Sequence, residues 1–268
     1  MDVTFEESQP WVILNKIEQQ IKEKIEKYGT PLKKWPGIKI NYGIKTGCNE
    51  AFIINEEKRK EILDNCLTEE EREKTDKLIR PILRGKDIKC GSYNWAGLYL
   101  IATHNGYYDA NNNFIAPINI NNEEFPSLKR HLDVFYNKLS SREDKGDTPY
   151  NLRSCAYMDD FDKQKILYSE ISQTPCFFLD DGSKFCPLNT AYYLIGDNMK
   201  LLVDYLNSQL SAWIFKKYYA GGGLGDSGYR YLKNTIVNLP IPSGTAGDFF
   251  LSFRLSPDEI AYIKNSIK

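Results

Sequence analysis

Short runs of β-branched and aromatic residues, broken at irregular intervals by isolated helical segments, constrain the fold of this chain most. Strand patterns occur over 37–44, 50–55, 97–104, 163–171, 176–185 and 191–196. A helix does not follow each strand, so the regular alternation that builds a parallel sheet is missing from the pattern. We therefore predict an α+β fold with mixed sheets and several helices.

A long amphipathic helix is predicted near the N-terminus. Ser8 and Pro10 are start signals, and Gly29-Thr30-Pro31 ends the helical pattern. Between them apolar side chains recur every three or four residues, at Leu14, Ile17, Ile21, Ile25 and Tyr28. The other positions are polar, so this apolar seam packs either on its own domain or on a neighbouring one.

Other helices and turns have recognisable signals. Thr68 and Glu71 form a capping-box pattern for a helix over 69–79, which Pro81 ends or bends. Further predictions are a helix over 125–144, a helix over 198–221, a terminal helix from the capping box at 256–259, a polar loop or hairpin over 105–120, and a hairpin turn at Asp181-Gly182.

Composition limits the classes of protein that are possible. The 268 residues have a formal net charge of −1, so binding to nucleic acid would need local basic patches. The six cysteines show no CxxC spacing and there are two histidines, so neither structural zinc nor a disulfide framework is expected. No long apolar run is present and residues 1–8 are acidic, which favours a cytoplasmic protein without a membrane segment.

Two glycine-rich stretches resemble nucleotide loops but lack their context. In "NYGIKTGCNEAF" (41–52), Lys45 and Thr46 precede the second glycine instead of following it, and a strand pattern comes next. In "GGGLGDSG" (221–228) the GxGxxG spacing follows a helix instead of a strand. The borders of the second stretch, Lys216 to Tyr219 and Tyr229 to Tyr231, are basic and aromatic, which suits contacts with phosphates and bases as well as a solvated helix end.

A local excess of positive charge lies between Arg72 and Lys89. This run contains seven Lys and Arg residues and three acidic residues. Part of this run is a solvated helix face, but Arg84-Gly85-Lys86-Asp87 sits on a turn, where polar contacts to a partner are possible.

Motifs for catalysis are missing from the sequence. GxSxG, HExxH and the Asp-Pro-Pro-Tyr or Asn-Pro-Pro-Tyr motifs of amino-group methylation do not occur. The carboxylates of "DDFDKQK" (159–165) lie near Lys163 and Lys165, so a stand-alone nuclease centred there is kept as an alternative, below a structural role. His104 and His131 have no neighbour that suggests a base or metal-ligand pair, and we expect structural roles for both.

The order of several motifs resembles one known family. Along the chain come "INYGIKTGCNEAFIIN", "IRPILRGKDIK", "YLIATH", "FPSLKRHLDVFYNKLSSRED", "KILYSEIS", "LNSQLSAWIF" and "LPIP". Together they resemble the TaqI-like C-terminal specificity domain of type IIG restriction-modification enzymes and related adenine-N6 DNA methyltransferases, over about residues 8–243. The chain departs from the family at Lys86, where many members have arginine.

The resemblance implies a target-recognition domain that reads double-stranded DNA and is not itself an enzyme. S-adenosylmethionine, and magnesium if the parent cleaves DNA, would then bind to an upstream methyltransferase domain or subunit. The implied layout is an N-terminal helix and linker toward that catalytic domain (1–36), the recognition domain (37–243) and a C-terminal helix (244–268). The DNA contacts expected on this basis are Lys45, Thr46, Asn49, Arg84, Lys86, Arg142, Lys216, Tyr229, Arg230 and Tyr231.

One further alternative belongs to another class. The chain could be a protein-interaction subunit whose N-terminal seam docks a catalytic partner without reading DNA. That alternative predicts an exposed apolar stripe on residues 14–28.

Overall fold

Two four-stranded sheets form the framework of the computed structural model, which describes residues 14–182, 184–225, 228–243 and 248–267. The first sheet is antiparallel, in the order β12 (Phe177–Asp180), β10 (Lys165–Ser169), β14 (Ala191–Ile195) and β2 (Lys39–Tyr42). The second has the order β13 (Cys186–Pro187), β4 (Ile79–Leu83), β7 (Leu98–Ile101) and β3 (Ile53–Asn55). Its β13–β4 pair is parallel and the others are antiparallel. The predicted α+β fold with mixed sheets is confirmed.

Four short antiparallel ribbons complete the strand pairs of the described chain. They are β1 (Gly29–Pro31) with β16 (Pro240–Pro242), β5 (Ile88–Lys89) with β6 (Ser92–Tyr93), β8 (Tyr107–Tyr108) with β9 (Phe114–Ile115), and β11 (Ile171–Ser172) with β15 (Tyr229–Arg230). The β8–β9 pair confirms the loop or hairpin predicted over 105–120.

Helices cover both ends of the molecule. The α-helices are α1 (Lys16–Tyr28), α2 (Asn49–Phe52), α3 (Glu56–Asp64), α4 (Glu69–Leu78), α5 (Pro126–Asp133), α6 (Tyr136–Ser141), α7 (Met199–Leu206), α8 (Gln209–Ile214), α9 (Lys233–Ile236), α10 (Phe249–Ser252) and α11 (Pro257–Ser266). Short 3-10 turns lie at η1 (Leu32–Lys34), η2 (Gly85–Asp87) and η3 (Met158–Asp162), and a π-helical turn, η4 (Phe215–Tyr219), follows α8.

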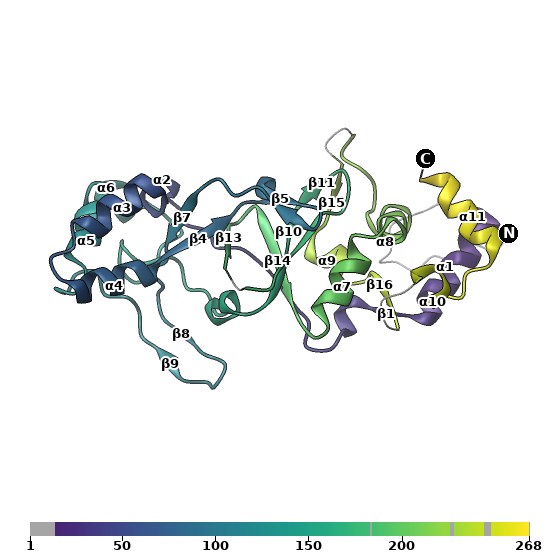
Figure 1. Cartoon of the computed structure of the whole chain (residues 1–268), viewed down its shortest axis with the longest axis horizontal. Coiled ribbons are helices and arrows are strands. Elements are labelled where there is room, and N and C mark those ends of the chain that lie inside the picture. Colours follow the sequence, from purple (N-terminus) through teal and green to yellow (C-terminus); the bar gives the residue numbers. More distant parts are fainter. Residues whose placement is uncertain (1–13, 183, 226–227, 244–247, 268) are drawn as a thin grey trace.

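The molecule is elongated and has a hydrophobic core in each half. Helices α2 to α6 gather at one end, α1, α10 and α11 lie at the other, and strands β10 and β14 run between them (Figure 1). The first core contains Phe52 and Leu128, and the second contains Ile21 and Tyr205. No described helix is both long and apolar enough to cross a bilayer.

The seam of the N-terminal helix is covered by this chain. Ile21 and Ile25 are fully buried in the second core. The Tyr218 hydroxyl donates to the backbone oxygen of Glu18 at 2.8 Å, which ties α1 to η4. Helix α1 is capped by Asn15 and ends at Tyr28 as predicted. The predicted start signals, Ser8 and Pro10, lie outside the described residues.

Several predicted elements are broken by tertiary contacts. The 198–221 helix divides because Asn207 bonds both the backbone N–H and the backbone oxygen of Phe177, and Ser208 then caps α8. The 125–144 helix divides at residues 134–135, and the 50–55 strand begins as the one-turn helix α2. Of the predicted capping boxes, the one at Ser256 and Glu259 is complete.

The hairpin predicted at Asp181-Gly182 is wrong. Strand β12 pairs with β10 in the first sheet, whereas β13, the next strand along the chain, pairs with β4 in the second. The chain crosses between the two sheets at this turn instead of folding back on β12.

Candidate nucleic-acid interface

Residues 187–191 bring two of the predicted loops together. On one side the Gly43 amide donates to the Ala191 oxygen at 2.9 Å, and Ile44 donates to Pro187 at 2.8 Å. On the other side the Gly85 amide donates to Thr190 Oγ1 at 3.0 Å. The 43–47 loop and the 84–87 turn, about 40 residues apart in the sequence, therefore flank one extended segment.

Close approach explains why each of these loops has a glycine. A Cβ atom at Gly43 would lie 2.3 Å from the backbone oxygens of Pro187 and Leu188, and one at Gly85 would lie 2.3 Å from that of Thr190. No side chain fits at such distances, so the glycines serve the packing of the backbone. The part of each loop that can meet a partner is its exposed polar side chains.

The end of strand β10 joins the turn to the aromatic and basic segment that follows the glycine-rich stretch. A Cβ at Gly85 would also approach Ser169 Oγ at 2.8 Å, which places the turn against the last residue of β10. Just beyond, Ile171 of β11 pairs with Arg230 of β15, and the Tyr231 amide donates to the Glu170 oxygen at 2.8 Å. Two segments predicted separately to contact DNA are thus held at one end of the first sheet.

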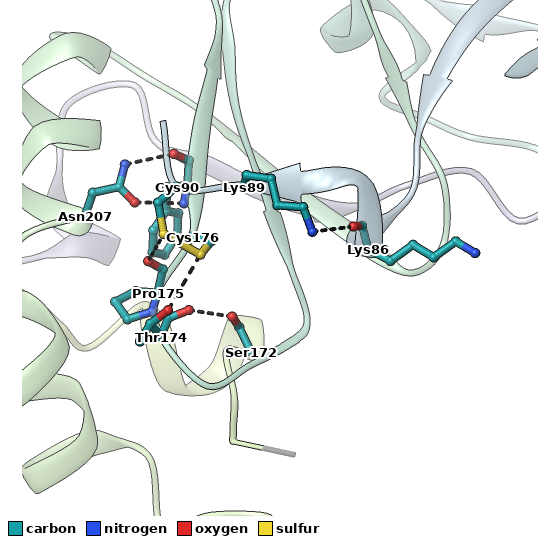
Figure 2. Close-up of a disulfide and its surroundings, with 9 residues drawn as sticks. Lys86, Lys89, Cys90, Ser172, Thr174, Pro175, Cys176 and Asn207 are labelled. Carbon is teal, nitrogen blue, oxygen red and sulfur yellow. Dashed lines mark hydrogen bonds between the residues drawn. A yellow bond between two sulfur atoms is a disulfide. The ribbon is translucent and has the colours of Figure 1, made fainter. Parts of the chain in front are cut away.

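Exposed positive charge gathers around this junction, which we call the basic rim. Its side chains are Lys86, Lys89, Lys216, Tyr229 and Arg230, with the Lys216 ammonium 5.2 Å from the Tyr229 ring centre. Lys86, Lys89 and Arg230 are exposed, and Lys216 and Tyr229 are half-buried. Within the described residues none of the four cations forms a salt bridge. Lys89 Nζ donates to the Lys86 backbone oxygen at 3.2 Å (Figure 2), so the positive charge of all four side chains is left to attract an anionic partner.

Arg84 lies beside the rim but is already paired. Its guanidinium donates from Nε and an Nη to the two oxygens of Asp87, each at 2.8 Å. This hydrogen bonding raises the pKa of Arg84, and despite the opposing effect of burial it lowers the pKa of Asp87. Arg84 closes the turn and presents Lys86, and we withdraw it from the expected phosphate contacts.

Most of the basic run is also neutralised within the chain. Arg72 pairs with Asp64, Lys74 with Glu70 and Glu124, and Arg80 with Asp162. With Arg84 paired as well, Lys77, Lys86 and Lys89 are the cations of residues 72–89 that lack a carboxylate partner in the described structure. The local excess of charge is therefore concentrated on the rim and at the end of α4.

The 43–47 loop forms a second, smaller polar surface. Lys45 is more than half exposed but pairs with Asp144 at 2.6 Å, and its hydrogen bond holds the pKa of Asp144 below the ordinary value. Asn49 is exposed and accepts a hydrogen bond from Thr46 Oγ1 at 2.6 Å. Thr46 itself is buried, so it orients Asn49 and does not face solvent.

Arg142 and Tyr231 lie in the interior. The Arg142 guanidinium donates to the backbone oxygens of Thr46 and Asn151 and stacks 4.5 Å from the Phe52 ring centre, and its burial lowers its pKa. Tyr231 is stacked on Phe215 at 4.3 Å between ring centres. Both were expected to touch DNA, but both side chains are buried inside the fold, as is that of Thr46, so none of the three faces a DNA partner.

The carboxylates considered for a nuclease are all paired with cations, and Asp159 and Asp160 share Lys163. Asp160 pairs with Lys163 at 2.8 Å, Asp162 pairs with Arg80, and Lys165 is buried against Asp180 at 2.9 Å. No group of three or more His, Cys, Asp or Glu side chains in the described structure is placed to hold a metal ion. This geometry suits structural ion pairs.

Both histidines are packed into the fold. His131 Nε2 lies 2.9 Å from the backbone oxygen of Ala51, and His104 Nδ1 accepts from the Gly106 amide at 3.3 Å. Burial lowers the pKa of each imidazole. The geometry gives both rings structural contacts.

A disulfide joins the two sides of the basic rim. Cys90, which directly follows Lys89, is bonded to Cys176, on the segment between β11 and β12 (Figure 2). The Gly91 amide also donates to the Phe177 oxygen at 3.1 Å, so the two segments are fastened side by side. The sequence offered no spacing signal for this pair. The expectation concerned a disulfide framework and did not anticipate this one bond, beside which the other four cysteines are free. Lys89 was likewise missed, although it borders the predicted turn.

The family of this chain follows from the central part of its sequence. The family model for the TaqI-like C-terminal specificity domain matches residues 80–241, and the chain belongs to this family. The resemblance inferred from the motifs is confirmed.

Two solved structures share the fold at low sequence identity. The type IIL restriction-modification enzyme MmeI, solved in complex with DNA, is 14% identical with a TM-score of 0.55, and the match covers 89% of this chain and 32% of MmeI. The type IIG restriction endonuclease BpuSI is 18% identical with a TM-score of 0.52, over 93% of this chain and 28% of BpuSI. This chain thus spans about a third of the length of each enzyme.

Proposed function

We propose that this chain recognises a target sequence in double-stranded DNA for a type IIG-like restriction-modification adenine methyltransferase, and that it is not itself catalytic. The observation that carries the proposal is the basic rim, where four cations with no carboxylate partner among the described residues meet at one end of a sheet in a chain of net charge −1. Membership of the specificity-domain family supports it, as does the shared fold with an enzyme solved on DNA.

Phosphate and base contacts are assigned to different side chains. Lys86, Lys89, Lys216 and Arg230 grip phosphates, and Lys45 joins them by exchanging Asp144 for a phosphate oxygen. Asn49 and Tyr229, with the exposed glycines at 221–223, face the base edges or the groove. Asn49 is oriented by the hydrogen bond that it accepts from Thr46 Oγ1.

Chemistry is assigned to the rest of the parent enzyme. An upstream methyltransferase domain or subunit would bind S-adenosylmethionine and, if the parent cleaves DNA, magnesium. We keep the layout in which residues 1–36 lead toward that domain, 37–243 recognise the target and 244–268 form the C-terminal helix. This division remains a proposal.

The interaction-subunit alternative receives less support. It requires an exposed apolar stripe on residues 14–28, but Ile21 and Ile25 of that stripe are fully buried against the second core. Leu14, Ile17 and Tyr28 of the stripe are half-buried against the same core, so the stripe is not a continuous exposed surface.

The proposal is tested by the salt dependence of DNA binding. Fluorescence anisotropy with a labelled duplex at several salt concentrations gives the slope of log affinity against log salt. Each lost phosphate contact should lower the magnitude of the slope by about 0.9. Arg230→Ala should show this change, and Lys77→Ala, an exposed lysine at the end of α4, should not. Equal slopes for Arg230→Ala and the wild type would remove Arg230 from the interface.

A further inference from the structure

A basic groove lies along the outer edge of the first sheet, away from the basic rim. Its lining includes Lys33 from η1, Lys39 and Asn41 from β2, and Lys233 and Val237 from α9 and its end. The three lysines are exposed and come from segments that are far apart in the sequence. The groove therefore forms only when folding brings these segments together.

The charge of the groove is only weakly compensated. Lys33 Nζ donates to the neutral Asn238 side chain at 3.0 Å. Lys39 Nζ is 3.9 Å from Asp160, whose same oxygen is already bonded to Lys163 at 2.8 Å. Lys233 has no carboxylate partner among the described residues, and no described carboxylate lines the groove. Three ammonium groups are thus available to one anionic ligand.

Protection of a sheet edge does not account for this arrangement. Lysine on an edge strand prevents pairing with another chain, which could explain Lys39 on β2. Lys33 and Lys233 are not on the strand. They are held near it because the amides of Leu32 and Lys33 donate to the backbone oxygens of Leu239 and Val237, at 2.9 and 2.8 Å. That pairing brings η1 against the end of α9, so the cations converge from three directions.

We propose that this groove binds phosphates of the DNA backbone as a second contact, separate from the basic rim. The inference rests on the proposed function. On β14, Ile195 pairs with Lys39 and Ala191 lies at the rim end, four residues away, which is about 13 Å along a strand. Lys233 follows Arg230 by three residues. Because duplex DNA has a phosphate charge about every 1.7 Å of its axis, one duplex has phosphates at both places.

The test compares two variants with the same change in net charge. Lys33→Gln/Lys39→Gln/Lys233→Gln removes the groove cations, and Lys60→Gln/Lys77→Gln/Lys264→Gln removes three exposed lysines elsewhere. Anisotropy with a labelled duplex should show a salt slope smaller by about 2 to 3 for the groove variant and an affinity at least about tenfold lower at low salt. The control should stay close to the wild type. Equal slopes for the two variants would overturn the groove assignment.

Further measurements separate the possible failures. Thermal unfolding establishes that the groove variant is folded, and restoring charge with Lys39→Arg in that variant should recover part of the slope. Saturable binding of inorganic phosphate, measured by calorimetry and lost in the groove variant while duplex binding is unchanged, would mean a free-anion site and would overturn the DNA assignment. If the wild type binds duplex and the groove variant matches it, only the groove fails. If the wild type binds no duplex, the proposed function fails with it.

Discussion

Asp87 accepts two hydrogen bonds from the guanidinium of Arg84 and a third, at 3.0 Å, from the Arg84 backbone amide. One carboxylate thereby closes the turn that presents Lys86 at the basic rim. The two neighbouring cations of the "RGKD" motif have different roles as a result, one inside the turn and one facing the partner.

Arg84→Ala and Lys86→Ala should therefore affect different properties, the first the stability of the fold and the second the salt dependence of DNA binding. Loss of Arg84 removes charge-assisted hydrogen bonds and should lower the free energy of unfolding by about 1–3 kcal/mol, with the salt slope of DNA binding unchanged. Loss of Lys86 should leave stability unchanged and lower the slope by about 0.9. Urea unfolding and anisotropy measure the two quantities. A reduced slope in folded Arg84→Ala would return Arg84 to the interface.

Acid should weaken the same turn. The pKa of Asp87 lies below its ordinary value of 3.8, so the folded state binds its proton more weakly than the unfolded state does. The stabilisation is therefore fully present above pH 3.8 and is lost as the pH falls through the folded pKa. The gap in unfolding free energy between the wild type and Asp87→Asn should be constant from pH 5 to 7 and should shrink below about pH 4. A gap that stays constant down to pH 3 would contradict this account.

Glycine substitutions test the reason for the two loop motifs. Gly43→Ala and Gly85→Ala force a Cβ to within 2.3 Å of backbone oxygens on 187–190, and each should destabilise the fold by about 1–3 kcal/mol or more. Gly182→Ala is the matched control, because nothing lies within 4 Å of a Cβ there. Chemical unfolding of all three variants makes the comparison. Gly85→Ala as stable as Gly182→Ala would mean that the turn does not pack as described.

The disulfide should contribute to stability. It closes a loop across a sequence separation of 86 residues, and bonds of this kind typically add about 2–4 kcal/mol by restricting the unfolded chain. The free energy of unfolding of the oxidised wild type, measured with urea, should exceed that of Cys90→Ser by about 2–4 kcal/mol. A thiol reductant should lower the unfolding free energy of the wild type to that of the variant, and it should leave the unfolding free energy of the variant unchanged. Alkylation followed by mass measurement should detect two fewer free thiols in the oxidised wild type than after reduction.

Local patterns predicted elements well where local contacts decide them. The predicted capping box at Ser256 and Glu259 depends on neighbours in the sequence, and it forms as predicted. The break at Asn207 depends on Phe177, thirty residues away, and the fate of the Asp181-Gly182 turn depends on β4 in the other sheet. Contacts between residues so far apart in the sequence cannot be predicted from local sequence patterns.

The same limit applies to the candidate site. The motifs around Gly43 and Gly85 were located from the sequence, but their partners on 187–190 lie more than 100 residues away, so the reason for the glycines was invisible. Arg142 looked like a surface cation because residue type alone does not report that three backbone oxygens surround it. The sequence gives no comparable sign that Lys86 is exposed whereas Arg142 is buried.

The most direct test of target recognition is selection from a random duplex pool. Folded protein would be incubated with the pool at low salt, and bound DNA would be sequenced after several rounds. We predict enrichment of a motif of a few base pairs, with the enrichment reduced in Asn49→Ala and retained in Lys77→Ala. Failure of the folded protein to retain any duplex, at a salt concentration where phosphate contacts are strong, would contradict DNA recognition by this chain.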